Sequence, residues 1–412
     1  MENDNLKQRA LDYHEFPAPG KLSVHITKPT NSQDDLSLAY TPGVAEPVLA
    51  IKENPENAYK YTNKGNLVGV LTNGTAVLGL GDLGPLASKP VMEGKAVLFK
   101  RFADIDVYDI EIDANNSQAF ISTAKRIAPT FGGINLEDIK APECFEIEQA
   151  LTEQLNIPVF HDDQHGTAIV VAAGLLNALE LQQKKLAEVK IVCIGAGAAG
   201  IASMRLLVAL GADKENMLLL DSKGVIHTGR SDLNAYKFAF ARTTECRSLA
   251  DALVDADVFI GVAKPDLLNA DLLKLMAPKP VIFALSNPDP EVRPEHAHKV
   301  RDDLVIATGR SDYPNQVNNV LCFPYIFRGA LDVRAECINQ SMQIAAVEAI
   351  RQLVHEAVPQ VVKDNYPGVT SWEFGPDYII PKPIDPRLKE RVPVAVAQAA
   401  IASGVSRINN LK

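Results

Sequence analysis

The stretch KIVCIGAGAAG, residues 190–200, joins an apolar run to three glycines spaced as G-x-G-x-x-G. The apolar run is predicted to be a strand, the glycines a tight turn, and the proline-free segment from Ala199 to about Leu210 a helix. The next apolar run, MLLLD, ends in Asp221. A strand, a glycine turn, a helix and a strand-end acid, in this order, are the pattern of a Rossmann dinucleotide site.

Each part of this pattern has a physical task. The turn must be tight, the backbone must approach a pyrophosphate closely, and the helix must begin with its free amides facing the phosphates. The predicted contacts with a dinucleotide therefore come from Gly195, Ala196, Gly197, Ala198, Ala199 and Gly200, and from Asp221.

The choice between NAD and NADP stays open at this level. Asp221 suits a free ribose 2′-hydroxyl, because a carboxylate accepts its hydrogen bond. Ser222 and Lys223 follow directly, and they could instead bind a 2′-phosphate by hydrogen bond and charge.

Outward from this motif, strand-like and helix-like segments alternate. After the helical run TAIVVAAGLLNALELQQ come VKIVCIG, MLLLD, DVFIGVA, VIFALSN and LVIATG, with helices between them. Strands this apolar belong to a parallel sheet covered on both faces. The sequence predicts an α/β fold, a doubly wound parallel-sheet (Rossmann) domain with its sheet between about residues 166 and 334, beside a smaller N-terminal α/β domain. We expect domains at 1–165 and 166–390 and a C-terminal helical segment at 391–412.

The N-terminal part has loops and short strands. In NLVGVLTNGTAVLGL two β-rich runs flank Asn73-Gly74, the dipeptide that a tight antiparallel hairpin prefers, so a hairpin is predicted there. Pro85 and Pro90 follow and would interrupt a crossover helix. We therefore do not expect the main pyrophosphate site at the other G-x-G-x-x-G motif, formed by Gly79, Gly81 and Gly84.

Two pairs of acids precede the Rossmann pattern. They are Glu137-Asp138 in NLEDIKAPE and Asp162-Asp163 in FHDDQHGT. Oxygen ligands from separated segments are what Mg²⁺ or Mn²⁺ prefers, with water and substrate completing the coordination shell. Solvated or helix-capping carboxylates are the ordinary alternative for each pair alone.

Zinc is not favoured. His161 and His165 are spaced i, i+4, but Gly166 and the neighbouring aspartates argue against the continuous helix that such a site needs. The cysteines lie far apart without a C-x-x-C pair, so reduced thiols are expected at Cys144, Cys193, Cys246, Cys322 and Cys337.

Composition excludes several classes of function. The chain has 412 residues, 47% of them hydrophobic, and a formal net charge of −10. The acidic balance argues against nucleic acid and anionic membranes as partners. The amino terminus lacks a signal-peptide pattern, and the longest apolar run, Ala168 to Leu176, is too short to span a bilayer. We expect a cytoplasmic protein.

Eight motifs in order resemble the malic enzymes, over about residues 10 to 390. They are AYTPGVAEP, GLGDLG, MEGKAVLFK, INLEDIKAPECFEIE, FHDDQHGTA, GAGAAG, ALSNP and PNQVNN. The resemblance is to the short bacterial type, without the acyltransferase-like domain that follows in hybrid relatives. It implies oxidative decarboxylation of (S)-malate to pyruvate and CO₂, with NADP, or NAD, as cofactor, a Mg²⁺ or Mn²⁺ ion, and a homodimer. NADP is slightly favoured, because relatives with DSKG at this position often use it.

The resemblance also implies the roles of particular residues. It makes Tyr40 the acid and Lys95 the base, and a lysine base needs a pKa well below its usual value. Asn287 would contact substrate and nicotinamide, and Asn319 the substrate. The implied metal ligands are Glu137, Asp138 and Asp163.

One position departs from the family pattern. Larger malic enzymes have an arginine before LGLGDLG that holds a malate carboxylate, whereas Val77 stands here, so that anchor is unassigned. Two other functions stay open. One is a metal-independent dehydrogenase of 2-hydroxy acids or amino acids, and the other is a non-catalytic dinucleotide sensor.

Overall fold

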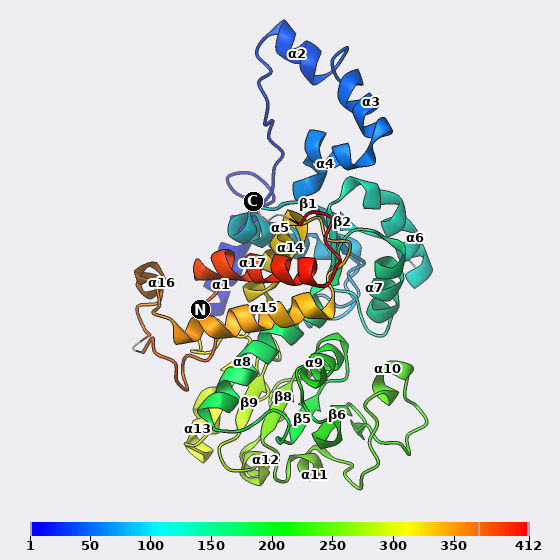
Figure 1. The fold of residues 1–412 in the computed structure, drawn as a ribbon. Helices are drawn as coiled ribbons and strands as arrows, with labels where there is room; N and C mark the ends of the chain where they lie inside the picture. The colour runs from blue at the N-terminus through cyan, green and yellow to red at the C-terminus, as the bar shows by residue number, and fades with distance from the viewer. Residues whose placement is uncertain (1, 115, 370, 410–412) are drawn as a thin grey trace.

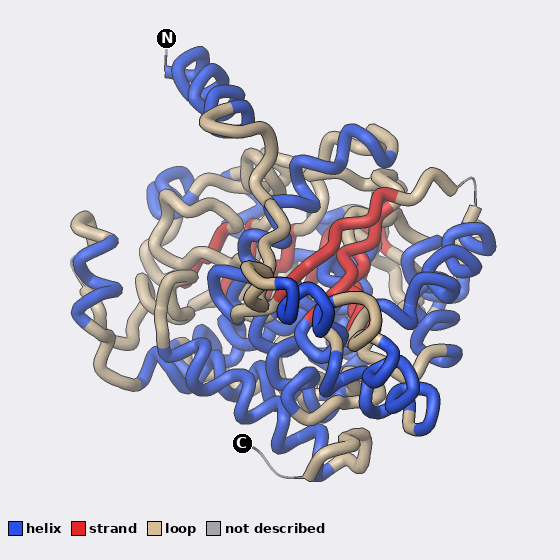
Figure 2. Tube along the Cα trace, turned by 90° about the horizontal axis from the view of Figure 1, so that it is seen from above, coloured by secondary structure: helices blue, strands red, loops and turns tan. Residues whose placement is uncertain are grey.

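The computed structural model describes residues 2–114, 116–369 and 371–409. Two parallel sheets lie at opposite ends of the body, and helices from the C-terminal part of the chain cross between them (Figure 1). The view from above shows the strands in the interior, surrounded by helices (Figure 2). The predicted α/β class with two sheet-containing parts is therefore confirmed.

The larger sheet has the order β10-β9-β8-β5-β6-β7. Its strands pair in parallel, except that β7 runs antiparallel to β6. The order reverses between β5 and β8, which is the place where doubly wound folds bind their ligands. The bounds are β5 Ile191–Ile194, β6 Met217–Asp221, β7 Gly224–Val225, β8 Val258–Gly261, β9 Val281–Ala284 and β10 Val305–Thr308.

Helices cover both faces of this sheet, as the alternation of segments predicts. The long apolar α8, Thr167–Leu181, is buried over most of its length, because it lies between this sheet and the C-terminal helices. The others are α9 Ala198–Ala209, α10 Ala235–Phe238, α11 Leu249–Leu253, α12 Ala270–Leu275 and α13 Pro294–Val300.

The smaller sheet has the order β2-β1-β3-β4, and every pair is parallel. Its strands are β1 Leu67–Thr72, β2 Asp106–Glu111, β3 Gly133–Leu136 and β4 Val159–His161. The predicted hairpin at Asn73-Gly74 is wrong. All of β1 is buried, and it pairs with β2 and β3 on its two sides, so no antiparallel neighbour fits. Gly74 instead lets the following loop return, since a Cβ there would overlap the backbone of Gly84.

The expected interruption by proline is also wrong, because α5 runs from Pro85 to Ala103. Pro85 occupies the first turn, where a backbone N–H has no helical partner in any case. Because Pro90 has no backbone N–H, the carbonyl of Leu86 lacks its helical partner. Leu86 is exposed, so water can hydrogen-bond to that carbonyl. The loop with Gly79, Gly81 and Gly84 thus joins β1 to α5.

The C-terminal helices connect the two parts. Helix α15, Gln340–Gln352, packs on α8, while α14, Phe323–Asp332, packs on α5 and on α17, Arg387–Ala402. The remaining helices are α1 Glu2–Glu15, α2 Gln33–Ala39, α3 Ala45–Glu53, α4 Ala58–Tyr61, α6 Ser117–Ile127, α7 Glu143–Gln154 and α16 Gln360–Asn365.

Two further expectations concern chemistry and location. All five cysteines are free thiols, and three of them are buried. Among the helices that the structure describes, none is both long and apolar enough to cross a bilayer.

Candidate active site

The predicted carboxylate cluster forms at the carboxyl edge of the smaller sheet. Glu137 and Asp138 follow β3, and Asp163 follows the neighbouring β4 in a π-helical turn, Asp162–Gly166. One ligand oxygen from each of the three side chains lies within 4.8 Å of the other two. The backbone N–H of Asp138 donates to Asp163 Oδ2 over 2.9 Å, which holds the two strand ends together.

The charges of this cluster are poorly compensated by the protein itself. Burial, and then the charge of Asp163, raises the pKa of the Asp138 carboxyl to about 7. Burial also raises the pKa of Glu137 well above its usual range, against the opposing effect of Lys95. Within the described chain, Asp138 Oδ2 is buried without a hydrogen-bond partner. Three hard oxygen ligands with an unsatisfied buried oxygen fit a divalent cation.

Lys95 projects from the middle of α5 into the same cluster. Its Nζ lies 2.7 Å from Asp162 Oδ2 and 2.8 Å from Glu137 Oε1, and 4.2 Å from the centre of the Phe323 ring. Burial by itself lowers the pKa of this ammonium, but the two carboxylates outweigh burial and raise it. The expected lowering of its pKa is therefore not found, because the family motif does not reveal how many carboxylates face the lysine.

Asp162 was predicted only as one of a pair of acids, and its contact with Lys95 was not predicted. Its side chain is fully buried and accepts hydrogen bonds from Lys95 and from Asn319 Nδ2, the latter over 3.1 Å. Thr167 in turn donates to Asn319 Oδ1 over 3.0 Å. A Cβ on Gly166 would overlap the Asp162 carboxylate, so glycine is required there. The only sequence signal was the doubled aspartate in FHDDQHGT.

Glu148 on α7 stabilises the π-helical turn Asp162–Gly166. It accepts hydrogen bonds from the backbone N–H of His161 and from Gln164, and it lies 2.9 Å from His165 Nε2. His161 is buried beside Asp163 instead. The two histidine side chains thus face different groups.

The glycine turn follows β5 and opens α9, as predicted, and it lies beside the end of β8. Gly195 has φ +115°, and a Cβ there would lie 2.5 Å from the carbonyl oxygen of Val262 after β8. A Cβ on Gly200 would overlap the Gly195 carbonyl, so this glycine allows α9 to begin against β5. Gly197, at the start of α9, has open space around its Cβ position, where a pyrophosphate can approach.

Two glycine substitutions separate the folding role from the binding role. Gly195→Ala is expected to destabilise the protein by about 1–3 kcal/mol, because the side chain is strained at this φ and meets Val262. Gly197→Ala is expected to leave the melting temperature nearly unchanged and to weaken dinucleotide binding roughly tenfold. Thermal melts and a fluorescence titration check both; equal melting temperatures for the two variants would contradict the assignment.

Asp221 ends β6 as predicted, but cations already surround it. Arg230 donates two hydrogen bonds to its carboxylate, of 2.8 and 3.0 Å, and Lys237 donates a third of 2.7 Å. Although partial burial opposes it, these bonds lower the pKa of Asp221 to about 2. Lys223 lies next to them and pairs with Asp232. The contacts of Arg230 and Lys237 were not predicted, since nothing in the local sequence indicates that these residues contact Asp221.

Asn287 follows β9 and is exposed at the crevice, where its carbonyl oxygen lies close to Gly79 of the other sheet's loop. Its loop is held by the buried Glu291, which accepts from the N–H groups of Ala263 and Ser286 over 3.0 and 3.1 Å. Val77 is buried as well, so it does not supply the missing carboxylate anchor.

Among the residues predicted to be catalytic or to bind the metal, Tyr40 is the one that this chain does not bring to the cluster. It caps α2, and three quarters of its surface is exposed. Figure 1 shows α2 and α3 projecting from the body, apart from both sheets.

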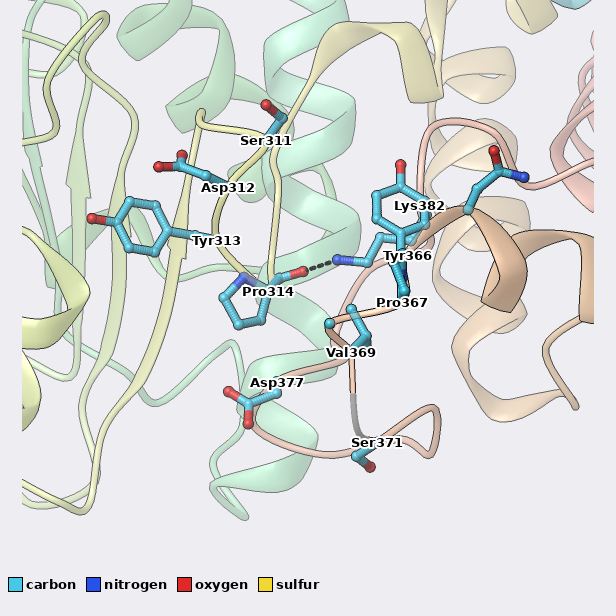
Figure 3. Close-up of a pocket in the computed structure, with 12 residues that line it drawn as sticks. Ser311, Asp312, Tyr313, Pro314, Tyr366, Pro367, Val369, Ser371, Asp377 and Lys382 are labelled. Carbon is cyan, nitrogen blue, oxygen red and sulfur yellow. Dashed lines mark hydrogen bonds between the residues drawn. The ribbon is translucent and has the colours of Figure 1, made fainter. Parts of the chain in front are cut away.

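A separate cavity of about 410 Å³ lies behind the loop that leads to Asn319 (Figure 3). At its wall Lys382 Nζ donates to the Pro314 carbonyl over 2.5 Å and lies 5.2 Å from the centre of the Tyr366 ring. Asn315 donates to the carbonyls of Ile306 and Pro376. These contacts hold the loop of residues 311–315 in place.

A Rossmann-type glycine turn, whose helix α9 contacts the π-helical turn of a buried cluster of carboxylates and a lysine, defines the class: an α/β oxidoreductase of the Rossmann type with a divalent-cation site. Residues 19–152 match the family described as "Malic enzyme, N-terminal domain", and residues 164–372 match "Malic enzyme, NAD binding domain". The chain belongs to the malic enzyme family.

Relatives agree over nearly the whole chain. It is 64% identical to the NADP-dependent malic enzyme of Halomonas elongata, covering 98% of this chain and 96% of that protein. It is 58% identical to one from Rhizobium meliloti, again over 98% of this chain but only 54% of the longer relative. The crystal structure of the malic enzyme from Pyrococcus horikoshii superposes with a TM-score of 0.89 at 44% identity, covering 98% of this chain and 92% of that one.

Proposed function

We propose that this chain catalyses the oxidative decarboxylation of malate to pyruvate and CO₂ with reduction of NAD(P), and that it needs Mg²⁺ or Mn²⁺. The observation that carries the proposal is the cluster of Glu137, Asp138 and Asp163 with Lys95 in contact. A metal-independent dehydrogenase would not need these buried carboxylates, and a non-catalytic sensor would not need the lysine. We retain the division at 1–165, 166–390 and 391–412, a cytoplasmic location and a homodimer as parts of the proposal.

The residues of the chain have distinct tasks in this reaction. A divalent cation held by Glu137, Asp138 and Asp163 would supply Lewis acidity toward the substrate oxygens, and the nicotinamide would accept the hydride. Lys95, as the neutral amine, would accept the proton of the substrate hydroxyl, and the contact with Asp162 orients its Nζ. Asn319 is fixed by Thr167 and Asp162, so its amide can position a substrate carboxylate. The family resemblance makes Tyr40 the acid that would protonate C3 of the enolate left after CO₂ departs, although within one chain Tyr40 lies on exposed α2, outside the cluster.

NADP is the preferred cofactor in this proposal. A 2′-phosphate at Asp221 would meet Arg230, Lys237 and Lys223, whose three positive charges exceed the two negative charges of Asp221 and Asp232. Because Arg230 and Lys237 already donate hydrogen bonds to the Asp221 carboxylate, this carboxylate binds a free 2′-hydroxyl less well.

Lys223→Ala is therefore expected to raise the KM for NADP about tenfold and to leave the KM for NAD within about twofold, because a charge-assisted hydrogen bond is lost only with the phosphate. Lys185→Ala, which removes another exposed lysine paired with a carboxylate, is the matched control. Steady-state rates with each cofactor give both constants. An equal rise for NAD and NADP would contradict the assignment of Lys223.

The proposed activity is tested by initial rates with malate across NAD, NADP, Mg²⁺ and Mn²⁺. Pyruvate and reduced cofactor should form in equal amounts, and chelation should stop the reaction until metal is restored. Full activity after exhaustive chelation would favour a metal-independent dehydrogenase. Dinucleotide binding without turnover of malate would favour a sensor.

A further inference from the structure

Lys382 is a buried lysine that the proposed mechanism does not use. It lies between α16 and α17, and only 4% of the residue is exposed. Its Nζ donates to the Pro314 carbonyl, but no carboxylate of the described residues forms an ion pair with it. Lysine is seldom buried to this extent without a paired negative charge, and an ammonium group has three hydrogens to donate. The described part of the chain therefore leaves the charge of Lys382 unpaired.

This lysine keeps its charge at neutral pH. Burial lowers the pKa of its ammonium group to about 8, and the charge of Asp377 acts in the opposite direction. Most molecules are therefore protonated at neutral pH. The ring of Tyr366, whose centre lies 5.2 Å from Nζ, stabilises a cation but does not neutralise it. An anion in contact with Nζ would neutralise it.

The ammonium group lies at the wall of the cavity of about 410 Å³ (Figure 3). Uncharged side chains from the loop after β10 and from the segment after α16 form much of this wall, among them Ser311, Tyr313, Tyr366 and Val369. Two carboxylates also line the cavity. Asp312 points away from Lys382 (Figure 3). It accepts two hydrogen bonds from Arg310, of 2.9 and 2.7 Å. Asp377 is exposed, so the buried charge at this cavity is positive.

One loop joins this cavity to the active site. Residues 309–318 follow β10 and lead to Asn319, whose amide donates to Asp162 over 3.1 Å. Pro314 lies in the middle of this loop, and its carbonyl accepts the hydrogen bond from Lys382. An anion that draws Nζ toward itself weakens this bond. The loop that positions Asn319 is then held less firmly.

We propose that this cavity binds a small monocarboxylate through Lys382, and that the bound acid raises the KM for malate through the loop that ends at Asn319. The second part rests on the proposed function, in which Asn319 positions a substrate carboxylate. One ammonium group balances one negative charge, whereas a polyanion would leave charge uncompensated near Asp377. The volume is at the lower end of the range for ligand pockets, and Tyr366 and Val369 offer an apolar wall, so a short carbon skeleton fits. Pyruvate, the product of the proposed reaction, is an acid of this class.

Binding is tested with propionate on the full chain without metal or dinucleotide, so that no cation holds the acid at the active site. Saturation-transfer NMR should detect bound propionate, and acetate and pyruvate should displace it. Lys382→Met should weaken binding at least about tenfold, because a charge-assisted hydrogen bond is lost. Lys184→Met is the matched control, since Lys184 also donates to a proline carbonyl, that of Pro278, but is paired with Asp257. This control should bind propionate like the wild type.

A second variant keeps the test decisive if Lys382→Met does not fold. Val369→Trp fills the cavity from another part of its wall and retains the lysine, so it should also abolish propionate binding. Thermal melts report the folding of each variant. A wild type that does not bind propionate, or a folded variant of either kind that binds it equally well, would overturn the site. Displacement by inorganic phosphate as readily as by acetate would contradict the monocarboxylate class.

The effect on the active site is tested by initial rates across malate concentrations, with and without propionate. In the wild type and in Lys184→Met, propionate should raise the KM for malate about fivefold and change kcat less than about twofold. The KM of Lys382→Met should not respond. An equal rise in all three proteins would show that propionate competes at the active site, and binding without any rise would refute the coupling. A wild type that does not oxidise malate would instead refute the proposed function, while the binding experiment still tests the cavity.

Discussion

Replacing Lys95 by alanine is expected to lower kcat with malate by a factor of roughly 10²–10⁴, the usual contribution of a positioned acid or base. Its Nζ contacts Asp162 and Glu137 in the cluster, and the dinucleotide turn lies on the other sheet. The dissociation constant for NADP should therefore change by less than about twofold. Stopped assays of pyruvate and a fluorescence titration of NADP give the two values.

The control for this prediction is Lys89→Ala, on the same helix and also paired with carboxylates, Asp109 and Glu111, outside the cluster. Its activity should stay near that of the wild type. Lys95→Met retains most of the side-chain volume without the charge, so it should be as inactive as Lys95→Ala while filling the space better. Near-normal turnover in either Lys95 variant would refute the role given to this residue.

Replacing Asp138 by asparagine is expected to have the second large effect. The substitution removes one of three anionic ligands and leaves the shape of the cluster almost unchanged, so the Mn²⁺ concentration for half-maximal rate should rise at least about tenfold. In thermal melts, Mn²⁺ should raise the melting temperature of the wild type by mass action and that of the variant much less. Activity and melts against Mn²⁺ concentration measure both effects.

Glu153→Gln is the matched control, since this exposed carboxylate lies on α7 between the two acid pairs and outside the cluster. Its metal dependence should equal that of the wild type. An Asp138→Asn protein with an unchanged metal requirement would show that the cation binds elsewhere.

The larger sheet could be predicted because local and tertiary preferences agree there. The apolar runs that become β5, β6, β8, β9 and β10 are buried on both faces, so their composition reports their place directly. The glycine turn could be recognised because side chains at Gly195 and Gly200 would meet the backbone, and Gly197 leaves space for a pyrophosphate.

For the smaller sheet, two predictions from local sequence were wrong, because tertiary structure overrides the rules behind them. Asn73-Gly74 has the composition of a hairpin, but β1 lies in the middle of a parallel sheet and the dipeptide begins a long loop. Pro90 was expected to break a helix that continues past it. Neither outcome is visible in a short window of sequence, because each depends on which segment lies alongside.

The site, too, could be predicted only in part. Family motifs predicted the three ligands and Lys95, and the structure brings them together. Which aspartate of the 162–163 pair faces the lysine is decided by the π-helical turn, so the contact between Asp162 and Lys95 was not predicted. The exposed position of Tyr40 on α2 could not be predicted either, because a motif records a residue type and not its position in space.

The central claim is that Glu137, Asp138 and Asp163 bind one divalent ion beside the nicotinamide site. Anomalous diffraction at the manganese edge, from crystals grown with Mn²⁺ and NADP, tests it most directly. One strong peak per chain is expected, with oxygens of all three carboxylates within about 2.5 Å of it. A strong peak elsewhere, or none at the cluster under conditions in which the enzyme is active, would contradict it.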